Sequence, residues 1–469
     1  MATTESFISN TAKINEIILT NFKSETMDVT NMVQEINIFD SVYSNCIAGT
    51  LDIVDSNDLL EYFPLIGQET LSIDFIIPSF DDNNNFKLID LRIYKISDRV
   101  IVTDKVQHYK LWFISSELIK SFEKKINKVW NSEVSSKIIN DAFVYLEADK
   151  TIVIEDTISI HNYIATNVSP LQIINYIASH RSINKNKLSD YVFFESFNSA
   201  KNGAIYIFAS LGSLMQRNAV AELSYNPVVT KNKLGLNVQP YTIENIVFSK
   251  GFDVVEQKTN GLYNQTYAYY DILRKKHVIQ KNSFDDVFNE TKDFKADGEK
   301  SNKSFVINTN TFSEYFRPVI VNSFPNKIST SKGIDNIFNK GVSINSKRNS
   351  SEYLKSHADQ YELNSNLLEQ TLYRRQILLR EFENNKIYIN DISGNYNYVS
   401  GNTVIFNKPH IVHNKTEVVT NNSSQYDKYT SGKYLIVRSR HRLTRSRGIN
   451  WSYKNYLEIT KNSVKTKYE

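Results

Sequence analysis

The chain has 469 residues and a formal net charge of +4, from 55 basic and 51 acidic side chains. That length is enough for about two to four domains, and the near balance of charge favours no particular class of partner. The single cysteine, Cys46, excludes an internal disulfide framework and a cysteine-based zinc site, so we expect a buried, inert thiol. Residues 1–15 lack the basic and apolar regions of a secretory signal, and no apolar run approaches about 20 residues. We therefore expect a soluble protein that is made in a reducing compartment and has no membrane segment.

Strand patterns dominate the first 120 residues. They lie at residues 33–39, 49–55, 71–75, 88–96 and 108–115, and turn residues separate them. Leu71, Ile73 and Phe75, for example, alternate with polar residues and so share one face of a strand. Strands that each bury one face need further strands of the same kind. Residues 1–120 are therefore predicted to form a small antiparallel β-barrel.

The pattern changes to helix after residue 120. Apolar residues recur at helical spacing over 134–143, and Ser169-Pro170 is typical of a helix start, with serine as the N-cap and proline at the first helical position. Strand patterns at 191–195 and 204–208 then flank a polar turn, which indicates a hairpin. Residues 121–235 are predicted to form a small α+β domain.

A weak internal repeat predicts a second barrel. Strand patterns at 433–443 and 451–463 correspond to those at 88–96 and 109–117. The matching landmarks are Phe39, Asp40, Gly49, Asp55 and Gly67 in the first copy and Phe252, Asp253, Gly261, Asp271 and Gly401 in the second. We interpret the second copy as residues 236–281 and 382–465, split by an inserted peripheral domain of residues 282–381. Chance similarity between two antiparallel β-domains is the alternative.

The insertion is polar and uneven. Residues 283–304 are rich in charge, which indicates a surface loop. Residues 352–381 are predicted to form a long helix with Arg374, Arg375 and Arg380 on its outer side. The predicted fold class is thus mainly β with α+β: two similar antiparallel β-barrels, the second one split, and a small α+β domain.

No arrangement of residues points to catalysis or to a cofactor. The sequence contains no Gly-rich phosphate loop, no HExxH and no Gly-x-Ser-x-Gly, and only His410 and His413 are close together among the histidines. A loop histidine pair without an acidic ligand is usually polar surface. The carboxylates Asp40, Asp55, Glu69 and Asp253 fall at strand ends and turns, where they commonly accept hydrogen bonds from backbone amides. We expect no enzyme activity and no catalytic, cofactor-binding or metal site.

One charged pattern remains. Arg438, Arg440 and Arg442 alternate along a predicted strand, so a period of two places all three on the same face. One interpretation is a solvated strand face that pairs with acids of a neighbouring strand or subunit. The other is a basic patch that faces nucleic acid. We favour the first, because phosphate binding usually recruits more positive charge than a net +4 chain carries.

Seven short motifs follow one another along the chain: Phe39-Asp-Ser, Gly49-x-Leu-x-Ile-x-Asp, Gly67-x-Glu-x-Leu-x-Ile, Asn167-Val-Ser-Pro-Leu-Gln-Ile-Ile, Tyr191-Val-Phe-Phe-Glu, Phe252-Asp-Val-Val and Ser431-Gly-Lys-Tyr-Leu-Ile. Taken in order, these motifs resemble the baseplate central hub protein of T-even-like contractile-tailed phages, a family related in fold to the base of type VI secretion spike proteins. Each motif alone has a plain strand or helix explanation, and their order carries the resemblance. It spans most of the chain and leaves the insertion unplaced.

The resemblance implies a structural protein of the virion. Its two tail-tube-like barrels per chain would form, in a homotrimer, a pseudo-six-fold ring that joins the hexameric tail tube to the trimeric central spike. The implied partners are the spike below, the tube or a tube-initiator protein above, and baseplate wedge proteins around the ring. DNA would only pass through the lumen, and no membrane is involved. The implied location is the tail baseplate, assembled in the host cytoplasm.

Two other functions stay open from the sequence. The chain could be the hub or spike base of a phage-derived contractile injection system, or a carbohydrate- or receptor-binding β-protein. The size of the native assembly separates the last of these from the others, because a hub should trimerise or bind a spike.

Overall fold

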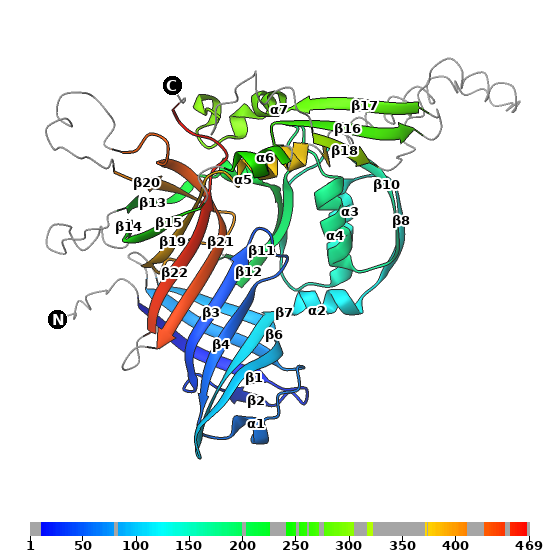
Figure 1. Ribbon diagram of the computed structural model, residues 1–469. Coiled ribbons are helices and arrows are strands. Elements are labelled where there is room, and N and C mark those ends of the chain that lie inside the picture. Colours follow the sequence, from blue (N-terminus) through cyan, green and yellow to red (C-terminus); the bar gives the residue numbers. More distant parts are fainter. Residues whose placement is uncertain are drawn as a thin grey trace, which may run out of the picture.

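The computed structural model describes a chain that is built mainly from β-strands (Figure 1). The described residues are 11–78, 83–198, 203–225, 241–249, 253–259, 262–271, 276–303, 317–321, 371–372, 374–409, 426–445 and 451–466. Within them, a 14-stranded sheet has the order β14-β13-β20-β21-β3-β4-β7-β6-β5-β1-β22-β19-β15, with β2 paired to β1 and a further pairing of β21 with β22. The predicted mainly-β fold with α+β parts is confirmed.

The first half of this sheet comes from residues 11–115. Its elements are β1 (Thr11–Thr20), β2 (Thr26–Asp28), β3 (Val33–Ser41), β4 (Ala48–Asp55), α1 (Leu59–Tyr62), β5 (Thr70–Pro78), β6 (Asn83–Thr103) and β7 (Val106–Ser115). The five strands expected here are all present, as β3 to β7, and β1 is an addition that pairs antiparallel with β5. Burial alternates strictly along β7, whose Tyr109, Leu111 and Phe113 point into the core.

The α+β region follows the first seven strands. It contains α2 (Ser116–Glu123), β8 (Ile126–Val134), α3 (Ser135–Leu146), β9 (Ile152–Ile154), β10 (Ile160–Val168), α4 (Pro170–His180), β11 (Tyr191–Asn198), β12 (Gly203–Ser210) and α5 (Leu211–Met215). Helix α4 begins at Pro170 with Ser169 as its N-cap, and the β11–β12 hairpin is formed, so both predictions are confirmed. Helices α3 and α4 lie side by side against the β8–β10 pair (Figure 1).

The second half of the sheet comes from residues 219–248 and 386–460. Its strands are β13 (Ala219–Tyr225), β14 (Thr242–Ile243), β15 (Asn245–Phe248), β19 (Lys386–Ser393), β20 (Thr403–Asn407), β21 (Gly432–Arg445) and β22 (Trp451–Thr460). The order β15-β19-β22-β21-β20-β13 matches the order β3-β4-β7-β6-β5-β1 of the first half. One difference is that β13 runs parallel to β14 and to β20, whereas β1 is antiparallel to β5. The expectation of antiparallel pairing is therefore corrected at β13.

The strand order also corrects where the second half begins and where it is interrupted. Strand β13 lies within residues 121–235, which we assigned to the α+β domain, yet it pairs with β20. Strands β16 (Asn264–Asp271) and β17 (Lys276–Ser283) form a separate three-stranded sheet with β18 (Arg317–Val321). The segment ending at Asp271 is thus not a strand of the second half. The chain leaves that half after β15 and re-enters it at β19.

In the segment between β15 and β19, two expectations are also wrong: the surface loop at residues 283–304 and the outer position of the three arginines. The segment contains α6 (Val254–Thr259), α7 (Phe284–Glu290), the 3-10 turns η3 (Lys292–Phe294) and η4 (Gly298–Lys300), and helical residues 374–381. Residues 283–304 are not a simple surface loop, because Phe284, Val287 and Phe288 are buried against Ile377 and Leu378. Some charges of this stretch are paired within the fold; Lys295, for example, forms a buried ion pair with Glu381.

The arginines of the predicted long helix are only partly on its outside. Arg374 is buried and forms an ion pair with Glu290. Arg375 donates hydrogen bonds to the backbone carbonyls of Ser189 and Tyr191 at 3.2 and 2.5 Å. Arg380 is partly exposed, as expected, and so is Arg375. Most of residues 352–381 lie outside the described part of the chain. Among the described residues, no helix is long and apolar enough to cross a membrane.

Candidate functional site

The two halves of the sheet are joined edge to edge by hydrogen-bonded strands. Strand β21 of the second half pairs antiparallel with β3 of the first, from Arg438 opposite Ser41 to Thr444 opposite Glu35. A short ladder between β1 and β22 makes a second link. Because the ladder continues across the junction, one sheet face runs through both halves.

The three predicted arginines lie on that face, at the junction. Arg438 is paired with Glu458 on β22 at 3.1 Å, while Arg440 and Arg442 are both paired with Glu35 on β3, at 3.5 and 2.7 Å. Burial works to raise the pKa of Glu35, but the hydrogen bonds from Arg442 and Asn37 and the charges of Arg442 and Arg440 together outweigh it and hold that pKa below its ordinary value. The arginines thus find acids on the two neighbouring strands of the same chain.

Aromatic rings complete this surface. The Arg440 guanidinium lies 5.7 Å from the ring centre of Phe39 and 5.0 Å from that of Tyr456, and Arg438 lies 5.8 Å from that of Tyr43. Phe39 and Tyr43 are exposed. Arginine and tyrosine are the residue types that protein interfaces enrich. The junction face is chemically suited to contact another protein surface.

The opposite face of the junction holds a buried carboxyl group. Asp40 Oδ2 accepts hydrogen bonds from the backbone amide and the hydroxyl of Ser400, at 2.9 and 3.1 Å. The carbonyl of Ser400 in turn accepts a hydrogen bond from Ser196 Oγ at 3.0 Å. Burial raises the pKa of Asp40 to about 7, although the bonds from Ser400 work to lower it. Asp40 therefore connects the first half of the sheet to the turn before β20.

The remaining landmarks that the structure describes have structural roles. A Cβ on Gly49 would lie 2.2 Å from the ring of Phe113, so only glycine fits there. Gly67 and Gly401 both have positive φ, 91° and 85°, in the turns before β5 and β20. Asp55 accepts hydrogen bonds from the amides of residues 57 and 59. Asp253, which directly precedes α6, accepts a hydrogen bond from the amide of Glu256 in the first turn of that helix. Phe252, Gly261, His410 and His413 lie outside the described residues.

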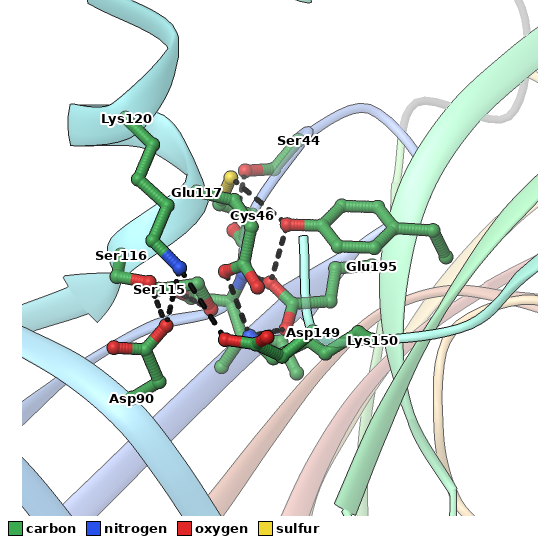
Figure 2. Close-up of polar contacts among 12 residues, drawn as sticks. Ser44, Cys46, Asp90, Ser115, Ser116, Glu117, Lys120, Asp149, Lys150 and Glu195 are labelled. Carbon is green, nitrogen blue, oxygen red and sulfur yellow. Dashed lines mark hydrogen bonds and ion pairs between the residues drawn. The ribbon is translucent and has the colours of Figure 1, made fainter. Parts of the chain in front are cut away.

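A buried ion cluster lies between the first half of the sheet and the α+β region (Figure 2). Lys150 Nζ is 2.9 Å from Glu117 Oε2 and 2.7 Å from Glu195 Oε1, and both carboxylates are fully buried. Glu195 Oε2 also accepts a hydrogen bond from the amide of Ile47 at 2.8 Å. Burial works against the charge on Lys150, but Glu195 and Glu117 raise its pKa above the ordinary value. The raised pKa favours the charged form of Lys150.

Beside the cluster, the single cysteine is buried as predicted. Cys46 Sγ lies 3.6 Å from the hydroxyl of Tyr206, and burial raises the pKa of the thiol. A cavity of about 170 Å³ adjoins the cluster and is lined by Lys150, Glu195 and Asp149. Because Lys150 is paired with both carboxylates, the cluster can position the two parts of the fold relative to each other. Within the described ranges, no group of three or more His, Cys, Asp or Glu side chains could hold a metal ion.

Sequence reasoning did not find this cluster, although a weak signal was present. Glu117 comes two residues after an apolar strand pattern and Glu195 ends one, and an unpaired charge would be costly if buried at either place. Their shared partner could not be identified, because Lys150 is separated from both in the chain.

Comparisons with known proteins give a fold likeness without a sequence match. No protein-family model matches the chain, and no curated protein matches it either. The solved structure of a tail protein from Neisseria meningitidis MC58 is similar with a TM-score of 0.50 and 8% identity, over 95% of this chain and 96% of that one. A 43 kDa prophage MuSo2 tail protein from Shewanella oneidensis is similar at 0.48 and 7%, over 95% and 98%. A Francisella PdpA–VgrG complex is similar at 0.45 and 11%, over 96% of this chain and 58% of that one. The chain is thus similar in fold to the Neisseria tail protein.

Proposed function

We propose that this chain is a structural protein of a contractile tail, a homotrimeric hub that forms a pseudo-six-fold ring between the hexameric tail tube and the trimeric central spike. The observation that carries the proposal is the repeated strand order of the two sheet halves, β3-β4-β7-β6-β5-β1 and β15-β19-β22-β21-β20-β13. The likeness in fold to the Neisseria tail protein supports it. We interpret the two halves as copies of one tube-like barrel.

Symmetry supplies the physical reason. A trimer can meet a six-fold tube evenly only if each chain offers two equivalent surfaces. Two barrels that are joined through the β21–β3 ladder meet this requirement within one chain. The α+β region and the inserted segment occur once per chain, so they belong on the outside of the ring. The spike would bind one end of the ring, and the tube or its initiator would bind the other.

The experiment is a measurement of mass and symmetry on the purified chain. Light scattering should give the mass of a trimer, and averaged electron-microscope images should show a closed ring with six similar lobes. A monomer in solution would contradict the hub function and would favour the receptor-binding alternative. A closed trimer without six-fold-like lobes would contradict the duplication.

A further inference from the structure

Strand β6 has a free edge where its counterpart β21 has a partner. β6 pairs with β5 as far as Arg92 and with β7 over residues 91–103. β21 pairs with β20 over residues 432–435 and with β22 over residues 435–445. The other edge of β21, from residue 438, is occupied by β3. No strand in the described part of the chain occupies the corresponding edge of β6 beyond Ile93.

The correspondence between these strands extends to single residues. The β6–β7 ladder has irregularities between Ile93 and Lys95, between Ser97 and Val100 and between Ile101 and Thr103, and the β21–β22 ladder has one, between Ile436 and Arg438. Matching the first irregularity of β6–β7 to that of β21–β22 makes Ile93 equivalent to Ile436. Their partners Phe113 and Ile459 are then also equivalent.

Two further equivalences follow by counting along the ladders. On β7, His108 lies five residues before Phe113 and pairs with Val100. On β22, Lys454 lies five residues before Ile459 and pairs with Arg442. Val100 therefore corresponds to Arg442. In the same way, Val247 of β15 corresponds to Asn37 of β3. Val247 pairs with Tyr388, which pairs in turn with Glu458 of β22. Asn37 pairs with Thr50, which pairs in turn with Trp112 of β7. Glu458 and Trp112 are equivalent because they directly precede the equivalent residues Ile459 and Phe113.

Strand β15 is the second free edge. It is the counterpart of β3 and pairs with β19, and no described residue pairs with its other side. The two free edges carry exposed apolar side chains: Val100 is 55% exposed and Val247 is 50% exposed. The other exposed apolar residues of β15 and of β6 beyond Ile93 are Tyr94, Ile96, Ile101, Val102 and Phe248. In Figure 1, β15 and β6 lie on different sides of the molecule, so they do not meet within one chain.

We propose that β15 of one copy pairs antiparallel with the distal part of β6, residues 95–103, of the next copy. The contact repeats, between chains, the contact that β3 makes with β21 inside the chain. Since Arg442 lies opposite Asn37 in that internal contact, Val100 of one copy lies opposite Val247 of the next. Exposed backbone edges and valine side chains are then covered together. The partner at both edges is a second copy of this chain.

The proposed contact is heterologous, because two different edges meet. Such a contact closes into a ring when its rotation suits the number of copies. In a trimer, internal β3–β21 ladders and intermolecular β15–β6 ladders would alternate around one continuous sheet. This inference rests on the proposed hub function, and it assigns the strands that hold the ring together.

The test uses cysteines at the two valines. Cys46 is buried and does not compete. The double variant Val100→Cys/Val247→Cys should, after mild oxidation, run as a disulfide-linked trimer on a non-reducing gel, and co-expressed single variants should give a linked dimer. Each single variant alone should remain unlinked. The control is Val129→Cys with Val247→Cys, because Val129 is 52% exposed but lies on β8, away from the proposed contact.

Charge variants give a second measurement. Val100→Lys or Val247→Glu alone should abolish the trimer in light scattering, and the two together should restore it, because opposite charges then face each other. A native trimer that shows no Val100–Val247 link would overturn the strand assignment and leave the hub function standing. A disulfide between two copies of the Val100→Cys variant would also overturn the strand assignment, because the contact would then join two β6 edges. A chain that stays monomeric would overturn both.

Discussion

Asp40 is the residue whose burial should be visible in solution. Its pKa is raised from 3.8 to about 7 by burial, so between these values the folded protein keeps a proton that the unfolded chain has lost. The free energy of unfolding should therefore fall as pH rises from about 4 to about 7. Asp40→Asn should reduce this fall by up to about 4 kcal/mol, measured by urea unfolding at several pH values. The pKa values of Asp190 and Glu381 are also raised, to about 6 and about 7. These two groups are present both in the native protein and in the Asp40→Asn variant, so they do not contribute to the difference between the two. Equal pH dependence in the two proteins would show that Asp40 does not hold the proton.

Lys150 should be among the most sensitive charged positions. Lys150→Met leaves Glu117 and Glu195 buried without their cation, and we expect the free energy of unfolding to fall by about 3–5 kcal/mol. Lys137→Met is the matched control, because Lys137 is largely exposed and pairs with Glu133 four residues away. That variant should cost less than about 1 kcal/mol. Thermal and urea unfolding measure both, and similar losses in the two variants would mean that the cluster is not energetically distinct. Adding Glu117→Gln and Glu195→Gln to Lys150→Met should recover part of the loss.

At the scale of the elements, β4 depends on a glycine. β4 lies between β3 and β7, and a Cβ at Gly49 would be 2.2 Å from Phe113 and 2.3 Å from the carbonyl of Asn37. Gly49→Ala should therefore lower the free energy of unfolding by about 1–3 kcal/mol. Combining it with Phe113→Leu makes room on one side, so the two losses should be less than additive in a double-mutant cycle. Strict additivity would indicate that the ring and the new methyl group do not meet.

The elements also show where sequence patterns succeed. β3 to β7, α4 and the β11–β12 hairpin follow from alternation, from an N-cap and from a turn, all of which are local signals. β15 has four residues and β14 has two, which is too short for periodicity to be read. The pattern at 264–271 is a genuine strand, but nothing local indicates which sheet it joins.

At the scale of the whole molecule, the two sheet halves should unfold together. The β21–β3 ladder and the Asp40–Ser400 bonds join them, and burial at the junction continues through Leu443 and Ile36. Backbone amides of this ladder should exchange with solvent as slowly as those of the β4–β7 ladder, because both open only on global unfolding. Hydrogen exchange followed by mass spectrometry measures this. Much faster exchange at the junction, or two separate calorimetric transitions, would show that the halves are independent units.

The sequence by itself determined the local chemistry: strands that bury one face, a helix that starts at Pro170, a buried thiol at Cys46, and an arginine row on one side of a strand. These depend on spacing along the chain, which the sequence contains directly. It also indicated a duplication, through the patterns that became β20, β21 and β22. Only the tertiary structure decided that β15 and β19, and not the 252–271 segment, complete the second strand order. It likewise decided that Arg375 donates a hydrogen bond to the carbonyl of Tyr191 and that Lys150 joins Glu117 to Glu195. Such pairings depend on which distant segments meet, and the free energy that selects them comes from long-range burial that no local pattern records.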